Sequence, residues 1–238
     1  MSIPSPHRSI RSFVVRAGRL TDAQRRALEE QWPRFGVEFS REPLDLDALY
    51  GRHAPRVVEI GFGNGAYLAA LAAERPARDY LGIEVHPPGI GHLLRLLATS
   101  SLTNVRVSGH DAVEVLDAQI PHASIDEIHI LFPDPWPKKR HHKRRLIQPA
   151  FVACLADRLV PGGLLKLATD WRPYAEHMLE VLVGCSALEN VAPDGGFAGK
   201  SGERAPTRFE LRGERLGHEI WELAFRKLAA EGPPVGRS

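Results

Sequence analysis

The chain has 238 residues, enough for one substantial core, and its 43% hydrophobic and 25% charged residues are ordinary for a soluble globular protein. Its formal net charge of +2 is nearly neutral, so any affinity for a polyanion must come from local patches. No apolar stretch approaches the length of a membrane span, and no signal peptide precedes the first predicted helix. The two cysteines, Cys154 and Cys185, fit neither a metal site nor a disulfide framework, so we expect a cytoplasmic protein.

Residues 1–20 are rich in Ser, Pro and Arg, and we expect them to form a basic arm that is mobile when no ligand is bound. Thr21 and Gln24 have the spacing of a capping box, which predicts a short helix through about Gln31. Residues 21–230 are expected to form a single domain, and the Pro/Gly-rich residues 231–238 a frayed tail.

Short apolar strands alternate with helices through the middle of the chain. The pattern predicts strands at 56–60, 78–85, 105–108, 125–132 and 164–169, and helices at 65–74, 89–98, 112–118, 147–159 and 174–183. A last strand pair is expected at about 188–191 and 220–225. This alternation predicts an α/β fold with a doubly wound, Rossmann-like sheet, mostly parallel with an antiparallel last strand. Ligands of such folds bind at the carboxyl ends of the strands.

A glycine-rich loop, Gly61-Phe62-Gly63-Asn64-Gly65, follows the first of these strands. Gly61, Gly63 and Ala66 also fit the dinucleotide fingerprint, so the glycine spacing alone does not separate NAD(P) from other cofactors. Glu59, two residues before the loop, would repel a pyrophosphate but attract the ammonium group of S-adenosylmethionine.

Two further acids follow the next two strands. Glu84 is placed to accept hydrogen bonds from both ribose hydroxyls, which either cofactor class would offer. Asp111 could accept from the adenine amino group, and it could also cap the helix that follows. With Glu59, these acids favour a methyl-donor site over a nicotinamide site.

The most informative segment is residues 130–145, ILFPDPWPKKRHHKRR. An apolar strand ends at Pro133, prolines fix the turn around Asp134 beside Trp136, and six cations and two histidines follow. Charge runs are usually solvated surface, but the position of this one after a strand favours phosphate binding. Methylation at guanine N7 needs no general base, and the carboxylate of Asp134 would stabilise the positive charge that develops on the purine.

A second acidic group lies further along the chain. Asp170 ends the fifth strand, and Glu210 lies in TRFELRGERLGH, residues 207–218. A carboxylate such as Glu210 could accept hydrogen bonds from guanine N1–H and N2–H2, although a charged surface hairpin would have the same composition.

Together these motifs resemble the single-subunit bacterial tRNA (guanine-N7-)-methyltransferases. The resemblance runs from about Arg11 to about Lys227 and rests on VVEIGFGNG, GIEVH, GHDAVEVL, LFPDPWPKKRHHKRR, LATDW and TRFELRGERLGH. It implies methyl transfer from S-adenosylmethionine to a guanosine in the tRNA variable loop, without a metal and without an obligatory protein partner.

The resemblance also implies a role for individual residues. With Gly61 and Gly63 of the loop, the S-adenosylmethionine contacts are Glu59, Glu84, Asp111 and Asp134, of which Asp134 is also the catalytic carboxylate. The substrate-binding residues are Lys138, Asp170, Thr207, Arg208, Phe209 and Glu210, although the family often has lysine in place of Arg208. The tRNA contacts are Arg140, His141, His142, Lys143, Arg144 and Arg145.

Three alternatives stay open at this point. The turn at Asp134 partly matches the acid-Pro-Pro-aromatic turn of methyltransferases that act on a base amino group, with Trp136 in place of the second proline. The glycine loop and Glu84 are compatible with an NAD(P)-dependent oxidoreductase. The basic run alone would also suit a non-catalytic RNA-binding module.

Overall fold

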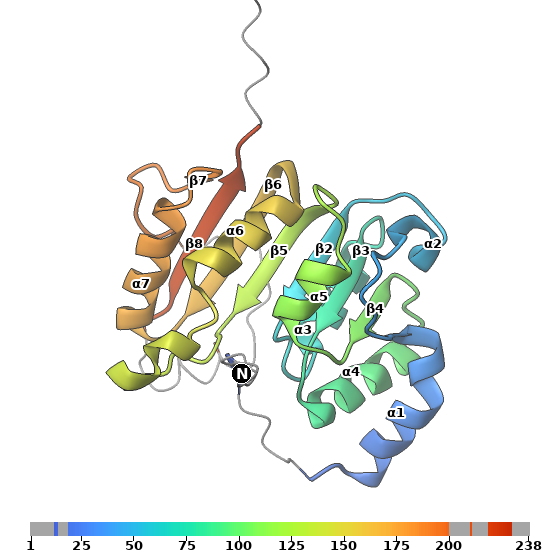
Figure 1. Ribbon diagram of the computed structural model, residues 1–238. Helices are drawn as coiled ribbons and strands as arrows, with labels where there is room; N and C mark the ends of the chain where they lie inside the picture. Colours follow the sequence, from blue (N-terminus) through green and yellow to red (C-terminus); the bar gives the residue numbers. More distant parts are fainter. Residues whose placement is uncertain (1–11, 14–18, 200–209, 211–218, 230–238) are drawn as a thin grey trace, which may run out of the picture.

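The computed structural model describes residues 12–13, 19–199, 210 and 219–229, and it is built on one eight-stranded sheet (Figure 1). The strands are β1 (Gly36–Val37), β2 (Arg56–Ile60), β3 (Asp79–Ile83), β4 (Val105–Ser108), β5 (Ile125–Leu131), β6 (Leu159–Thr169), β7 (Leu188–Asn190) and β8 (Trp221–Lys227). The helices are α1 (Asp22–Phe35), α2 (Leu46–Tyr50), α3 (Ala66–Glu74), α4 (Pro87–Ser100), α5 (Ala112–Ala118), α6 (Pro149–Arg158), α7 (Arg172–Val183) and the 3-10 helix η1 (Lys139–Arg144).

The order of the strands places the site. The sheet runs β1-β4-β3-β2-β5-β6-β8-β7, and every pairing from β1 to β6 is parallel. Strand β8 is antiparallel to both β6 and β7. The chain leaves β2 towards one edge of the sheet and returns on the other side of β2 with β5. This order and these strand directions confirm the predicted fold class. Ligands of such folds bind at the switch point, outside the carboxyl ends of the strands.

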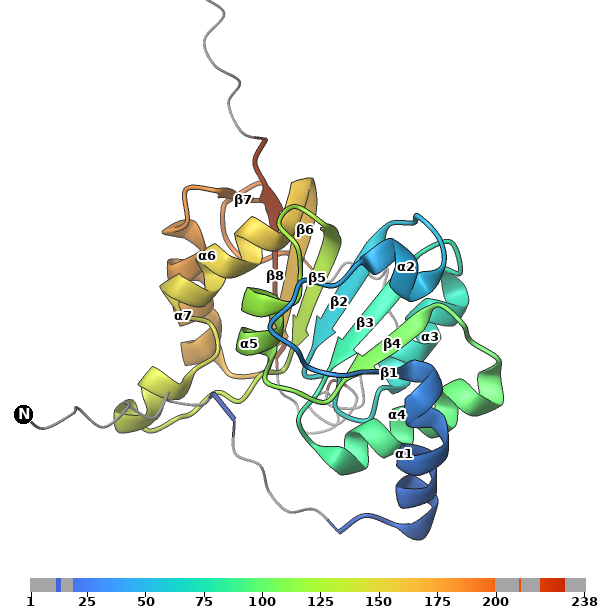
Figure 2. The same cartoon turned by 45° about the vertical axis from the view of Figure 1, so that its right-hand side comes forward.

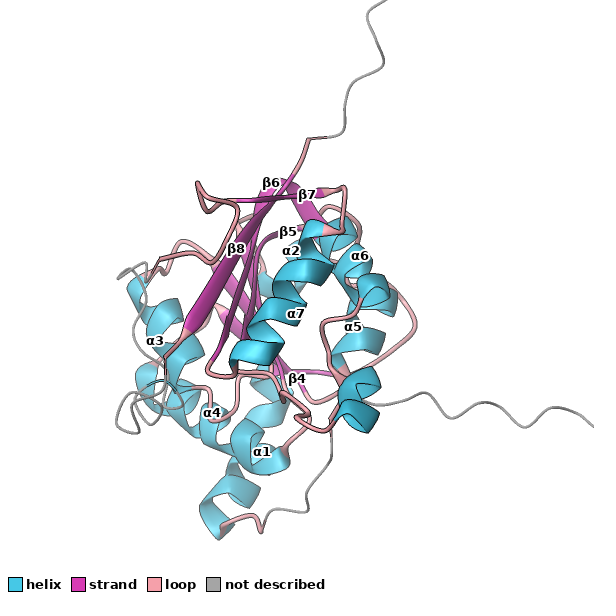
Figure 3. Cartoon of the chain, turned by 90° about the vertical axis from the view of Figure 1, so that its left-hand side faces the viewer, coloured by secondary structure: helices cyan, strands magenta, loops and turns pink. Residues whose placement is uncertain are grey.

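Helices cover both faces of the sheet. Helices α1, α3 and α4 pack on one face, and α2, α5, α6 and α7 on the other, as the edge-on view shows (Figure 3). Figure 2 brings β1 and β4 forward, with α1 and α4 beside them. Side chains of β2 alternate between these layers: Val57 packs with α3 and α4, whereas Val58 and Ile60 pack with the opposite layer. Glu59 therefore points to the α3 side.

Most predicted elements are confirmed, with shifted ends. The capping box forms as expected, since Thr21 N–H donates to Gln24 Oε1 (2.9 Å) and Gln24 N–H donates to Thr21 Oγ1 (3.2 Å). Helix α1 continues to Phe35, beyond the predicted end, with Pro33 in its last turn. Strand β1, helix α2 and the first residues of β6 were not predicted from the sequence. The domain boundaries stay a prediction.

Within the part of the chain that the structure describes, no helix is long and apolar enough to span a membrane.

Candidate active site

Left-handed glycines build the loop after β2. Gly61, Gly63 and Gly65 have φ values of +75°, +58° and +71°, which side chains rarely adopt. Helix α4 packs directly on the loop, because a Cβ atom added to Gly89 would lie only 2.0 Å from the carbonyl oxygen of Gly63. The loop therefore presents backbone, without side-chain bulk, at the end of the central strand.

The carboxylate of Glu84 connects this loop to the end of β3. Its Oε2 accepts from Gly63 N–H at 2.9 Å. Its Oε1 accepts from the backbone N–H groups of Val85 (2.7 Å) and His86 (3.0 Å). These bonds fix the side chain, and Oε2 retains acceptor capacity for a hydroxyl donor in the cavity beside it.

A cavity of about 710 Å³ opens at this edge of the sheet, within the size range of cofactor sites. Five residues predicted to hold the cofactor meet here, from the segments that follow four different strands: Gly61, Gly63, Glu84, Asp111 and Asp134. The rest of the wall includes the chain before α1 (Ser12, Phe13), the ends of the strands (Ile60, Ile83, Leu131) and the prolines beside Asp134 (Pro133, Pro135, Pro137).

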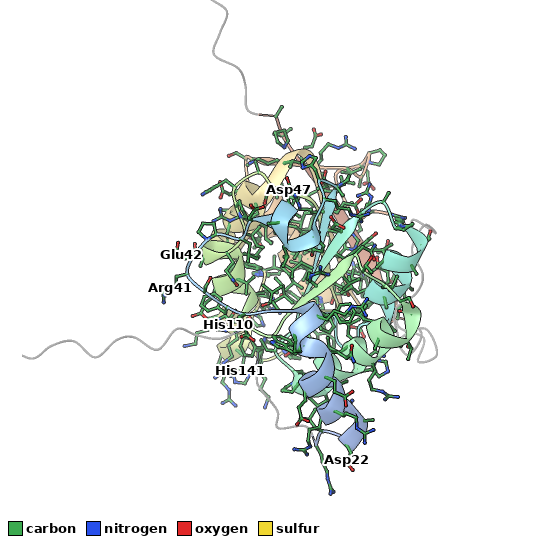
Figure 4. The ribbon with its side chains drawn as sticks, turned by 90° about the vertical axis from the view of Figure 1, so that its right-hand side faces the viewer. Asp22, Arg41, Glu42, Asp47, His110 and His141 are labelled. Carbon is green, nitrogen blue, oxygen red and sulfur yellow. The ribbon has the colours of Figure 1, made fainter. Side chains whose placement is uncertain are left out.

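Asp111 caps the helix that follows it, and its contact with adenine stays a prediction. Its Oδ1 accepts from Val113 N–H at 3.0 Å and so caps α5, while the residue also lines the cavity. The neighbouring His110, which was not predicted as a site residue, also lines the cavity and bonds to Glu114. Its ring stacks on Phe39 with 3.8 Å between centroids and 11° between planes, so that this wall is flat and aromatic. Figure 4 shows His110 on the same side of the molecule as His141.

Glu59 is buried near the end of β2, and its contact with the cofactor stays a prediction. Its side chain is 3% exposed and is not among the described residues that line the cavity. Its register neighbours are Gly82 on β3 and His129 on β5. Because side chains alternate along β2, the side chain of Glu59 shares the α3 face of the sheet with Val57.

A buried polar network in the same layer was not expected from the sequence. Glu127 Oε2 accepts from Lys166 Nζ (2.9 Å) and pairs with His129 Nε2 (3.1 Å), while Oε1 accepts from Arg78 Nη1 (2.7 Å). Burial alone would raise the pKa of Glu127, but the hydrogen bonds from His129 and Lys166 and the charge of Lys166 outweigh it and lower the pKa. Burial lowers the pKa of His129, which is 3% exposed.

The turn that carries Asp134 is held in an unusual conformation. Phe132 and Trp136 have φ values of +55° and +45°, and such backbone is costly for bulky residues unless the surroundings enforce it. Phe132 N–H donates to the carbonyl of Ala168 on β6 at 2.8 Å, which anchors the start of the turn. Asp134 itself is exposed at the mouth of the cavity.

Trp136 is packed on three sides. Its Nε1–H donates to the carbonyl of Ser12 (3.0 Å), which brings the chain before α1 to the cavity. The His141 ring meets it edge-on at 5.8 Å, and the Arg144 guanidinium lies 5.2 Å from the centre of its ring. The side chains of His141 and Arg144 therefore support the turn through their contacts with Trp136.

The basic segment divides into exposed and buried cations. Lys138, Arg140 and Lys143 are exposed on and beside η1. Arg145 is only 4% exposed, and its side chain packs inward against the turn, so that its contact with tRNA stays a prediction. Burial and then the nearby cations, Arg140 first, lower the pKa of His141, so that this ring adds little positive charge at neutral pH.

The residues predicted to bind the substrate lie partly outside the described residues, as Thr207, Arg208 and Phe209 do. Glu210 is buried, and Asp170 is half-buried at the end of β6. Neither Lys138 nor Asp170 is among the described residues that line the cavity. The described part of the chain holds no cluster of His, Cys, Asp and Glu suited to a metal.

Comparison with known proteins identifies the family. A sequence model of the family described as "Putative methyltransferase" matches residues 53–223. The tRNA (guanine-N(7)-)-methyltransferase of Burkholderia cenocepacia strain HI2424 is 58% identical over 226 residues, 95% of this chain and 88% of that protein. Its counterpart in Burkholderia thailandensis is 56% identical over 229 residues, 96% of this chain and 86% of that protein.

Solved structures agree on the fold. The crystal structure of the 16S rRNA methyltransferase KamB matches with a TM-score of 0.57 and 16% identity, over 79% of this chain and 95% of that one. The aminoglycoside resistance methyltransferase NpmB1 matches with a TM-score of 0.51 and 15% identity, over 81% and 95%. At these identities the likeness concerns the fold alone. The sequence relatives decide the family: this chain belongs to the tRNA (guanine-N(7)-)-methyltransferases.

Proposed function

We propose that this protein transfers a methyl group from S-adenosylmethionine to N7 of a guanine in tRNA. The observation that carries the proposal is that Gly61, Gly63, Glu84, Asp111 and Asp134 line one cavity, in a chain 58% identical to a relative of that name. Action on tRNA also implies the cytoplasm as the place where the protein works.

The cavity fits S-adenosylmethionine in size and in the chemistry of its donors and acceptors. The left-handed glycine loop admits a ligand against its backbone, and Glu84 offers a carboxylate oxygen to a ribose hydroxyl. Asp111 and the stacked ring of His110 suit a flat adenine with an amino group. When bound, the cofactor supplies an electrophilic methyl group on a positively charged sulfur. Glu59, buried near the end of β2, would attract its ammonium group.

Asp134 is suited to stabilise charge. The N7 atom of guanine attacks with its own lone pair and carries no proton, so no general base is required. Positive charge moves from the methyl donor to the purine, and a fixed carboxylate at the mouth of the cavity lowers the energy of that change. The two left-handed residues on either side of Asp134 keep the carboxylate in place before the substrate binds.

The exposed cations are suited to the RNA backbone. Lys138, Arg140 and Lys143 lie four, six and nine residues after Asp134 and would bind phosphates while the target nucleotide enters the cavity. We further propose that the target is the guanosine of the variable loop, and that Lys138, Asp170 and residues 207–210 hold it.

The direct test is incubation of the purified protein with labelled S-adenosylmethionine and unmodified tRNA, followed by nucleoside analysis. The proposal predicts 7-methylguanosine as the labelled product. Label in a nucleoside methylated on an exocyclic amine would instead support the amino-methyltransferase alternative. Binding of NAD(P) but not of S-adenosylmethionine would support the oxidoreductase.

A further inference from the structure

We propose that Arg145 is a positioning residue that holds the Asp134 turn in its reactive geometry. This inference rests on the proposed function, because it concerns the carboxylate that would act in methyl transfer. It separates Arg145 from the exposed cations of the same run, which would bind phosphates.

The burial of Arg145 is the first observation. Only 4% of the surface of Arg145 is accessible to solvent, whereas Arg140 and Lys143 are exposed. Arginine is rarely buried to this extent unless it is paired. Among the described residues, no carboxylate pairs with Arg145, and its partners there are a carbonyl oxygen, an imidazole and an aromatic ring. A guanidinium held by these partners cannot reach an RNA phosphate without leaving them.

The contacts of the guanidinium converge on the turn. Its Nε–H donates to the carbonyl oxygen of Pro135 at 3.1 Å, one residue after Asp134. Its Nη2 lies 3.2 Å from His142 Nε2, and its central carbon lies 4.9 Å from the centre of the Tyr174 ring. The planar fork of arginine can make these three contacts together, whereas the ammonium group of lysine cannot.

Tyr174 provides a fixed base for this arrangement. It is fully buried in the first turn of α7, and its hydroxyl oxygen accepts from Ile147 N–H at 3.3 Å. Burial raises the pKa of Tyr174 to about 12, and the charge of Asp134 contributes to this rise. Arg145 therefore connects a rigid helix to a turn that contains two left-handed residues, Phe132 and Trp136.

The two adjacent arginines thus support neighbouring residues of the turn, both of which follow Asp134. Arg144 lies over the ring of Trp136, and Arg145 bonds to the carbonyl of Pro135. Without the hydrogen bond from Arg145, the turn would relax and displace the Asp134 carboxylate. A displacement of about 1 Å at a reacting group can cost roughly 10²-fold in rate.

The test compares Arg145→Gln with Arg140→Gln by single-turnover methyl transfer at saturating tRNA and S-adenosylmethionine, and by tRNA binding across a salt series. We expect Arg145→Gln to lower the single-turnover rate by about 10²-fold, with the tRNA Kd and its salt slope close to those of the wild type. Arg140→Gln should instead weaken tRNA binding and flatten the slope by roughly 0.7–0.9.

Chemical rescue separates positioning from a general loss of structure. Arg145→Ala leaves space between the Pro135 carbonyl and the Tyr174 ring, so millimolar guanidinium should raise its rate and equimolar ammonium should not. If Arg145→Gln and Arg145→Ala fail to fold, Arg145→Lys tests the positioning role instead. Lysine keeps the charge and most of the aliphatic stem but lacks the planar guanidinium. This variant should fold and still lose rate.

Three results would overturn the proposal: a flattened salt slope with a normal rate in Arg145→Gln, a normal rate in Arg145→Lys, or no rescue of a folded Arg145→Ala. The wild type is assayed first for 7-methylguanosine. Its failure to form this product would refute the proposed function, whereas a failure confined to the Arg145 variants would refute only the positioning role.

Discussion

The backbone N–H of Gly63 donates to Oε2 of Glu84 at 2.9 Å and so joins the glycine loop to the end of β3. The other oxygen of Glu84 accepts from Val85 and His86. One carboxylate therefore shapes two walls of the cavity and also offers an acceptor to a ligand.

Glu84→Gln should weaken S-adenosylmethionine binding by roughly 10- to 10²-fold, because the amide places N–H donors against backbone N–H groups and removes a charged acceptor. Calorimetry measures the cofactor Kd directly. Glu42→Gln is the control, since Glu42 is exposed on the loop after β1 and lies outside the cavity lining (Figure 4). Equal affinity in Glu84→Gln and the control would exclude Glu84 from the cofactor site.

Asp134→Ala should lower turnover by about 10²–10³-fold, the scale measured when one preorganised electrostatic interaction is removed from an active site. The melting temperature should change little, because the side chain is exposed at the cavity mouth. Asp134→Asn keeps the shape and removes the charge, so it should be nearly as slow. A wild-type turnover in the asparagine variant would refute the proposal that the charge of Asp134 stabilises the reaction.

Neutralising Arg140 and Lys143 together should weaken tRNA binding and reduce the log–log salt slope by roughly 0.7–0.9 for each phosphate that the protein no longer neutralises. Both side chains are exposed, so the fold should be unaffected. Filter binding from low to high salt measures the slope. The control is Arg226→Gln, an exposed cation at the opposite end of the sheet that pairs with Glu189. Identical slopes for the double variant and the control would place the RNA surface elsewhere.

The stability of the protein should fall as the pH is lowered from 7 to 5, partly because of His129. Burial lowers the pKa of this residue below its ordinary value of about 6.5, so the unfolded chain binds more protons in this range. The contribution of His129 is fully present above about pH 6.5 and is lost as the pH falls through the folded-state pKa. Its neighbour Glu127 stays ionised throughout, because its pKa is lowered.

Urea unfolding at pH 5 to 7 tests this account of His129. His129→Gln should reduce the pH dependence of the free energy of unfolding by up to about 1.4 kcal/mol per pH unit. His53→Gln is the matched control, because the side chain of His53 is 85% exposed. A wild-type slope in His129→Gln would show that the buried imidazole does not titrate in this range.

The fold could be predicted from the sequence because its strands and helices are strongly patterned. Strand β2 and helix α5 have the predicted limits, since apolar residues and caps mark both ends. The two-residue β1 and the short α2 were missed, because neither is long enough to show a period.

The sequence predicted which residues gather at the candidate site better than it predicted how deeply each of them is buried. Residues at the carboxyl ends of strands, such as Glu84 and Asp111, could be placed by topology alone, and both line the cavity. The depth of Glu59 and the burial of Arg145 depend on tertiary packing, which a local pattern does not contain. The Glu127–His129–Lys166 network joins neighbouring strands by register, and a single strand's sequence carries no sign of it.

The most direct test of the account uses two tRNA transcripts that differ at one atom of the target base. One carries guanosine at the proposed variable-loop position, and the other carries 7-deazaguanosine, which replaces N7 by carbon and keeps the remaining hydrogen-bonding edge. Label transfer from S-adenosylmethionine is measured for both. The account predicts 7-methylguanosine from the first transcript and no labelled nucleoside from the second. Equal labelling of the two transcripts would contradict it, because the methyl group would then go to an atom other than N7.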